Sequence, residues 1–127
     1  MNTEINTVVA VLGPGAIGTT VAAALHEVDR TPLLCGRTPR DHLTLQDGDR
    51  FITVPGPVQT NPAQITRTVD LIFLAVKSTQ IDAAAEWLRA LTGPETVVCV
   101  LQNGVEQLDR LATYSLPGQS VPAVVWF

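Results

Sequence analysis

The sequence predicts an α/β fold, a doubly wound and mostly parallel sheet with helices on both of its faces. Three observations support this. Five apolar runs are continuous rather than alternating, which is typical of strands covered on both faces. The segments between several of these runs have helical spacing, so strands and helices alternate. The chain has 127 residues, 46% apolar and 16% charged, which fits one domain and excludes a disordered chain.

The apolar runs are the expected strands of this sheet. They cover residues 8–12, 31–35, 71–76, 97–101 and 121–127. The second run is the weakest, and its Pro32 indicates that the strand begins there because proline is confined to strand starts and edges.

Two segments have the spacing of amphipathic helices. Apolar residues recur on one helical face over residues 16–28 and again over residues 79–91. Gly93-Pro94 supplies the stop of the second helix, and its Trp87 is expected in the core or in a domain contact. A third, shorter helix is expected over residues 104–111.

Residues 38–68 interrupt the alternation of strands and helices. This segment is rich in proline and glycine, which mark turns and loops. Within it, residues 51–54 and 58–60 lie on either side of Pro55-Gly56-Pro57 and predict a short hairpin.

Charge and composition exclude several classes of function. The net charge is −4, from 8 basic and 12 acidic residues, and no basic stripe indicates a nucleic-acid partner. No apolar run is long enough for a membrane span, and the first residues lack the pattern of a secretory signal, so a cytoplasmic protein is expected.

Cys35 and Cys99 lie in apolar runs and are expected to be reduced, buried thiols. Two cysteines and two histidines without close spacing argue against a zinc site.

A glycine-rich loop joins the first expected strand to the first expected helix. Its residues are Gly13, Pro14, Gly15, Ala16, Ile17 and Gly18. This spacing in this context is the fingerprint of a dinucleotide site in a Rossmann-type domain. Gly13 would permit the tight turn, Gly15 the approach of a pyrophosphate and Gly18 close helix packing, with the helix N-terminus facing the phosphates. The alternative is a purely structural strand-to-helix turn.

The residues after the second expected strand indicate the type of dinucleotide. An NAD site usually has an acidic residue there, which binds the ribose 2′-hydroxyl. Here Gly36-Arg37 occupies the place, and the first acid is Asp41. A guanidinium suits a phosphate, so the sequence predicts NADP(H), with Arg37 at the 2′-phosphate and Arg40 assisting. The alternative is that Arg37 is a solvated loop residue.

Two further candidates follow the ends of the third and fourth expected strands. Lys77, the only lysine of the chain, follows the third, and Asn103 follows the fourth. Ligands bind at the carboxyl ends of parallel strands, so both side chains are candidates for contact with cofactor or substrate. The alternatives are a surface lysine and an ordinary Asn-Gly turn.

Together these pieces resemble the N-terminal domain of the ketopantoate reductase family. The resemblance rests on the glycine loop, Gly36-Arg37, residues 74–77 with the following Ser-Thr-Gln, and residues 102–105. They occur in the order and at about the spacing of the family, and they cover nearly the whole chain.

The resemblance implies NADPH-dependent reduction of 2-dehydropantoate (ketopantoate) to pantoate, on the way to pantothenate and coenzyme A. It assigns the glycine loop to the pyrophosphate of NADP(H) and Arg37 to the 2′-phosphate. It makes Lys77 and Asn103 the catalytic residues of this chain, which line the active-site cleft and also contact the cofactor. No metal is implied.

Family members also carry a second, mostly helical domain with a general-acid lysine and a glutamate, which this chain does not match. Residues 1–127 are therefore expected to be an NADP-binding Rossmann domain that is inactive alone, with the C-terminal catalytic domain absent. The expected partners are a keto acid substrate and that missing domain, with no nucleic acid or membrane partner, and a homodimer is left open. Two alternatives remain: a reductase of the same superfamily for another keto acid or an imine, and a non-catalytic NADP-sensing module.

Overall fold

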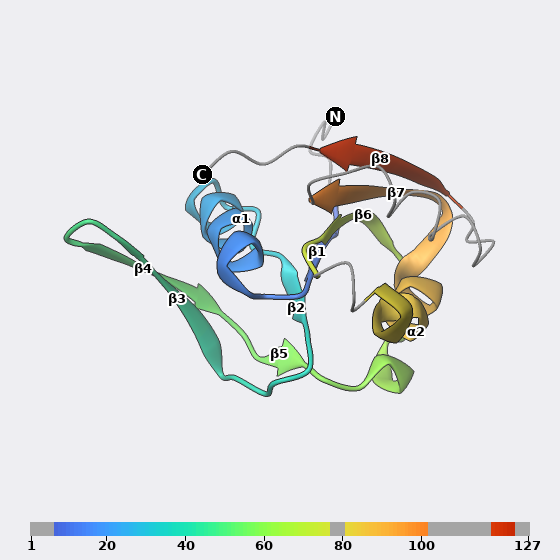
Figure 1. The fold of residues 1–127 in the computed structure, drawn as a ribbon, viewed down its shortest axis with the longest axis horizontal. Helices are drawn as coiled ribbons and strands as arrows, with labels where there is room; N and C mark the ends of the chain where they lie inside the picture. The colour runs from blue at the N-terminus through green and yellow to red at the C-terminus, as the bar shows by residue number, and fades with distance from the viewer. Residues whose placement is uncertain (1–6, 77–80, 102–117, 124–127) are drawn as a thin grey trace, which may run out of the picture.

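The computed structural model describes residues 7–76, 81–101 and 118–123, and its centre is a six-stranded parallel sheet (Figure 1). The strand order is β5-β2-β1-β6-β7-β8, and each neighbouring pair is parallel. The strands are β1 (Val9–Leu12), β2 (Leu33–Cys35), β5 (Val58–Gln59), β6 (Val69–Leu74), β7 (Thr92–Leu101) and β8 (Gln119–Ala123). The chain builds outward from β1 through β2 to β5 and then returns to β6 on the other side of β1. The strand order therefore reverses between β1 and β6, where Rossmann-type folds bind ligands.

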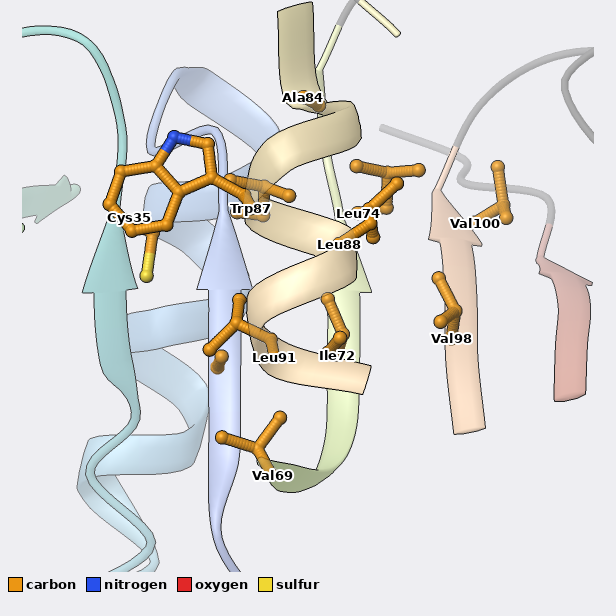
Figure 2. Close-up of a cluster of buried hydrophobic side chains, with 12 residues drawn as sticks. Cys35, Val69, Ile72, Leu74, Ala84, Trp87, Leu88, Leu91, Val98 and Val100 are labelled. Carbon is orange, nitrogen blue, oxygen red and sulfur yellow. The ribbon is translucent and has the colours of Figure 1, made fainter. Parts of the chain in front are cut away.

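Two helices cover opposite faces of this sheet, as the sequence predicts. They are α1 (Ala16–Glu27) and α2 (Ile81–Leu91). Alternate residues of β1 face the two helices: Val11 belongs to the buried cluster that contains residues of α1, whereas Ala10 and Leu12 belong to the one that contains residues of α2. Figure 2 shows α2 lying across the strands, with Leu88 and Leu91 in the second of these clusters. The strands β1 and β6 contribute residues to both clusters, which explains their continuous apolar runs.

The bounds of several elements differ from the predictions. The first helix ends at Glu27, one residue early, and the expected start of the second, residues 79–80, lies outside the described residues. The strand β7 begins at Thr92 directly after α2, so Gly93-Pro94 follows the helix but is part of the strand. The expected third helix over 104–111 and the end of the fifth run, 124–127, also lie outside the described residues.

The predicted hairpin between residues 51–54 and 58–60 is wrong. The hairpin is formed by β3 (His42–Asp47) and β4 (Arg50–Pro55), which pair antiparallel and project beyond α1 (Figure 1). The strand β5, after Gly56-Pro57, instead joins the main sheet beside β2. The physical reason is side-chain alternation: every second residue of the hairpin is apolar and packs with the cluster under α1. These residues are Leu43, Leu45, Ile52 and Val54.

The short segment η1 (Pro62–Gln64) is a 3-10 helix that leads from β5 back to β6. Its amino end is capped by Asn61, whose side chain accepts a hydrogen bond from the Ala63 N–H at 3.0 Å. Neither helix of the described ranges, α1 or α2, is long and apolar enough to cross a membrane.

Candidate functional site

A cavity of about 450 Å³ lies at the carboxyl ends of β1, β2 and β6. Three segments line it. The first is Leu12 with residues 13–17 of the glycine loop, and the second is residues 36–38 with Arg40, after β2. The third is formed by residues 75–76 and the α2 residues Ala83, Ala84 and Trp87. The cavity therefore lies at the strand-order reversal, and residues far apart in sequence meet there.

Gly13 fixes the start of the glycine loop. Its φ is +92°, in the left-handed region that favours glycine, and its N–H donates a 2.9 Å hydrogen bond to the Cys35 carbonyl at the end of β2. A Cβ at this position would lie 2.7 Å from Val76 Cγ1, so any side chain would collide with the opposite cavity wall. Gly13 is required by the turn itself.

Gly18 and Gly36 permit close backbone packing around the same loop. A Cβ on Gly18 would lie 2.3 Å from the Gly13 carbonyl oxygen, and a Cβ on Gly36 would lie 2.7 Å from Pro14 Cδ. Because Gly18 has no Cβ, the first turn of α1 can pack against the loop. Because Gly36 has none, the segment after β2 can do the same. Gly18 is buried behind the loop and does not line the cavity.

Gly15 differs from these three glycines because nothing in the structure crowds it. A Cβ there would meet no heavy atom within 4 Å, its φ of −80° suits any residue, and it lines the cavity. Gly15 is also the N-cap of α1, with no side-chain cap and no acidic residue in the first turn. The first N–H groups of a helix have no intrahelical acceptor, so this helix start is open to an anion.

The charge of the cavity is opposite to that of the whole chain. The chain carries −4, but among the described residues the cavity is lined by two arginines, Arg37 and Arg40, and by no Asp or Glu. Both arginines are exposed, and neither forms an ion pair within the described ranges. An ion pair on the hairpin side joins Arg50 to Glu27. Two free guanidinium groups beside a helix N-terminus favour a ligand with several phosphates.

The thiol of Cys35 adds no charge near this site. It is fully buried at the end of β2, and desolvation raises the pKa of the thiol to about 12. Burial also raises the pKa of Cys99, and both cysteines are free thiols. Within the described ranges no group of three His, Cys, Asp or Glu side chains could hold a metal ion.

These features fit a dinucleotide. The open space at Gly15 accepts a pyrophosphate against the helix start, and the arginines suit a further phosphate at the end of the cavity nearest β2. The structure thus brings the predicted residues 13–17 together with Arg37 and Arg40. Lys77 and Asn103 lie outside the described residues, although Lys77 follows Val76, which lines the cavity.

Sequence reasoning missed the wall formed by α2. Ala83, Ala84 and Trp87 line the cavity although none carries a motif. Their spacing of three and four residues places them on one face of a helix, and the helix follows β6, whose carboxyl end borders the cavity. Those two signals together could have indicated this wall.

Comparisons with known proteins agree with this picture. The family described as ketopantoate reductase PanE/ApbA matches residues 9–127. A 2-dehydropantoate 2-reductase of Mycobacterium tuberculosis is 52% identical over 119 residues, which cover 93% of this chain and 40% of the relative. The solved structure of a dimeric ketopantoate reductase from Staphylococcus aureus has a TM-score of 0.75 and 30% identity, over 94% of this chain and 40% of that one.

The fold is also shared more widely. A D-mandelate dehydrogenase, solved with NADH and anilino(oxo)acetate, has a TM-score of 0.75 and 23% identity, over 85% of this chain and 37% of that one. At this identity the likeness concerns the fold alone. The chain spans about 40% of the length of the 2-dehydropantoate 2-reductase that it matches.

Proposed function

Because the chain belongs to the ketopantoate reductase family, we propose that it is the NADP(H)-binding half of a 2-dehydropantoate 2-reductase. Membership of the family implies a nicotinamide dinucleotide as cofactor. The enzyme would reduce 2-dehydropantoate to pantoate, as the names of the relatives suggest. Since the chain spans 40% of such a relative, the remaining length would form a second domain that completes the active site.

One observation carries the choice of NADP(H): the cavity combines an open helix start at Gly15 with Arg37 and Arg40 and no acidic residue among its described walls. The pyrophosphate would contact the N–H groups of the first turn of α1. The 2′-phosphate would contact Arg37, which follows β2 directly after Gly36, where an NAD site usually has a carboxylate. A carboxylate there would repel a phosphate, and its absence removes that repulsion.

The residues of this chain bind and orient the reactants. When bound, reduced nicotinamide supplies the hydride for the keto carbon of the substrate. The glycine loop and the arginines hold the phosphates, which fixes the position of the cofactor across the carboxyl edge of the sheet. Lys77 and Asn103, which follow strand ends in the sequence, would line the cleft, and the general acid would come from the second domain.

The proposal extends to partners and location. The substrate would be a keto acid, and the surface of this domain would dock against the second domain. A homodimer is part of the proposal because the Staphylococcus aureus relative is described as dimeric. The free thiols of Cys35 and Cys99 support a reducing compartment such as the cytoplasm.

The first test is the cofactor preference of Arg37→Ala. Removal of the guanidinium should weaken NADPH binding by about 1.5–3 kcal/mol, the scale of a hydrogen bond to a charged group. NADH binding should change little, because NADH lacks the 2′-phosphate. Calorimetric titration with both cofactors measures this, with Arg67→Ala as a control that removes an exposed arginine away from the cavity. Equal losses for the two cofactors would contradict the assignment.

The second test concerns the reaction. The full-length enzyme should oxidise NADPH with 2-dehydropantoate, whereas residues 1–127 alone should bind NADPH without turnover. In the full-length enzyme Lys77→Ala should lower the rate and leave the fold intact, because a strand-end lysine would face the cleft. Binding by the full-length protein with no turnover on any keto acid would favour a sensor, and preference for another keto acid would reassign the substrate.

A further inference from the structure

Trp87 is the large aromatic residue of the cavity wall, and its setting is unusual for a core tryptophan. It is only 6% exposed and belongs to the buried cluster with Leu88 and Leu91, yet it lines the cavity. Leu88 and Leu91, on the same helix and in the same cluster, do not line the cavity. One edge of the indole is therefore presented to the space where the ligand would lie.

The position of Trp87 indicates which part of the ligand it would meet. It belongs to the same buried cluster as Cys35, which ends β2, and it lines the cavity together with Gly36 and Arg37, the next two residues. In Figure 2 the indole extends from α2 toward the end of β2. If Arg37 binds the 2′-phosphate, which is attached to the adenosine ribose, Trp87 lies at the adenosine end of the cavity.

The indole nitrogen is the polar group that Trp87 offers. In the described part of the chain the Nε1–H has no hydrogen-bond acceptor, although only 6% of Trp87 is exposed. Among these residues, the fully buried side-chain atom without a partner is Thr92 Oγ1. Figure 2 shows the nitrogen on the side of the ring toward which the strand arrows point, the carboxyl edge that carries the cavity.

We propose that Trp87 is a binding residue for the adenine of the cofactor: its indole edge forms the wall beside the base, and its Nε1–H donates a hydrogen bond to an adenine ring nitrogen. The inference rests on the proposed function, since it needs a dinucleotide in this cavity. It adds a residue that reads the base, whereas the glycine loop and the arginines contact phosphates. A neutral donor of this kind contributes equally to the binding of NADPH and NADH, which carry the same base.

The test is equilibrium binding of three ligands to the full-length enzyme with Trp87→Phe: NADPH, NADH and 2′,5′-ADP, which carries the adenosine end alone. Phenylalanine keeps an apolar ring and removes the donor. Affinity for all three should fall by the same factor, about three- to tenfold, the effect of one neutral hydrogen bond. Replacement of Trp87 by 3-benzothienylalanine, which keeps the bicyclic shape and lacks only the N–H, should reproduce the loss.

The matched control is Leu91→Val, which shortens a fully buried side chain of the same cluster that does not line the cavity. It should leave all three affinities unchanged. An equal loss in Leu91→Val, or unchanged binding in both Trp87 variants while the parent enzyme binds, would overturn the role of Trp87 and leave the proposed function standing. A parent enzyme that binds neither NADPH nor 2′,5′-ADP would instead overturn the proposed function, and this inference with it.

Discussion

The two loops that flank the cavity after β1 and after β2 are built in opposite ways. In residues 13–18 the shape is set by backbone contacts, since a Cβ on Gly13 or Gly18 would lie within 2.7 Å of neighbouring atoms. Beyond Gly36, which packs against the first loop, the cavity is lined in residues 37–40 by exposed side chains, those of Arg37, Thr38 and Arg40. Under the proposed function, the first loop would bind the ligand through a fixed backbone, and the second through charges on side chains. Substitutions should therefore affect folding in the first loop and affinity in the second.

The largest effect should come from Gly18→Ala. The new Cβ would lie 2.3 Å from the Gly13 carbonyl oxygen, so α1 and the loop would have to separate. We expect the free energy of unfolding to fall by about 3 kcal/mol, at the upper end for an overpacked core. Urea denaturation measures it, and Gly15→Ala, with no heavy atom within 4 Å of its Cβ, is the control that should stay near the parent. Equal stabilities would mean that the close packing at Gly18 is dispensable.

Gly15→Val tests whether a substitution in the first loop, residues 13–18, can lower affinity without affecting folding, as expected for the second loop, residues 36–40. Its φ of −80° and the open space around its Cβ predict an intact fold, but the branched side chain would fill the place of the pyrophosphate. NADPH affinity should fall at least tenfold, or about 1.4 kcal/mol. Circular dichroism and calorimetry on the same sample separate fold from binding.

Gly48→Ala is the matched control for this prediction. Gly48 also has open space around it, but it lies at the tip of the β3–β4 hairpin with a φ of +60°. It should lose some stability and keep its NADPH affinity, the reverse of Gly15→Val. Retained tight binding by Gly15→Val would mean that the loop is only a structural turn.

The fold could be predicted from the sequence wherever a strand is buried on both faces. The runs that contain β1 and β6 are continuous and apolar because both strands contribute side chains to the cluster at α1 and to the cluster at α2. The hairpin prediction is wrong because Pro55-Gly56-Pro57 is not the turn. The turn is at Gly48, and the alternation of Leu43 and Leu45 is the signal of the first strand. The strand β5 is two residues long and carries no periodicity of its own.

The site could be predicted only where it is local in sequence. The spacing of the glycines and the position of Arg37 after a strand are local signals, and the structure brings both to one cavity. The place of Trp87 in the cavity wall depends on how α2 packs on the sheet, about fifty residues after Gly36 and Arg37. Such a contact is set by packing of the whole core, so Trp87 read as an ordinary buried residue.

The exclusion of water from the end of β2, where the core meets the second loop, can be tested through Cys35. This residue is fully buried and directly precedes the segment 36–40. Burial raises the pKa of this thiol from 9.0 to about 12. Below pH 9 the thiol is neutral in both states and its contribution to stability is complete. As the pH rises from 9 to 12 the unfolded chain loses this proton and the folded one keeps it, so the free energy of unfolding falls by about 1.4 kcal/mol per pH unit.

Cys35→Ala should flatten this alkaline decline, measured by urea denaturation between pH 8 and pH 10.5. Cys99→Ala is the matched control. Its thiol is less buried, so it should flatten the decline less. If the free energy of unfolding falls equally with pH in the parent and in Cys35→Ala, the thiol titrates freely and the end of β2 is open to water.

The smallest effect should come from Arg40→Ala, which sharpens the contrast between the two loops. Arg40 is exposed and lines the cavity, so its charge would attract the phosphates without a fixed partner in the fold. We expect stability to be unchanged and NADPH affinity to fall about two- to fivefold at low salt, since exposed charge pairs contribute up to about 1 kcal/mol. The loss should shrink above about 0.5 M salt, where the Debye length is a few ångströms. Arg67→Ala, an equal change of charge away from the cavity, should leave binding unchanged. If Arg67→Ala weakens binding as much, the net charge of the domain attracts the ligand, and the second loop has no specific role beyond Arg37.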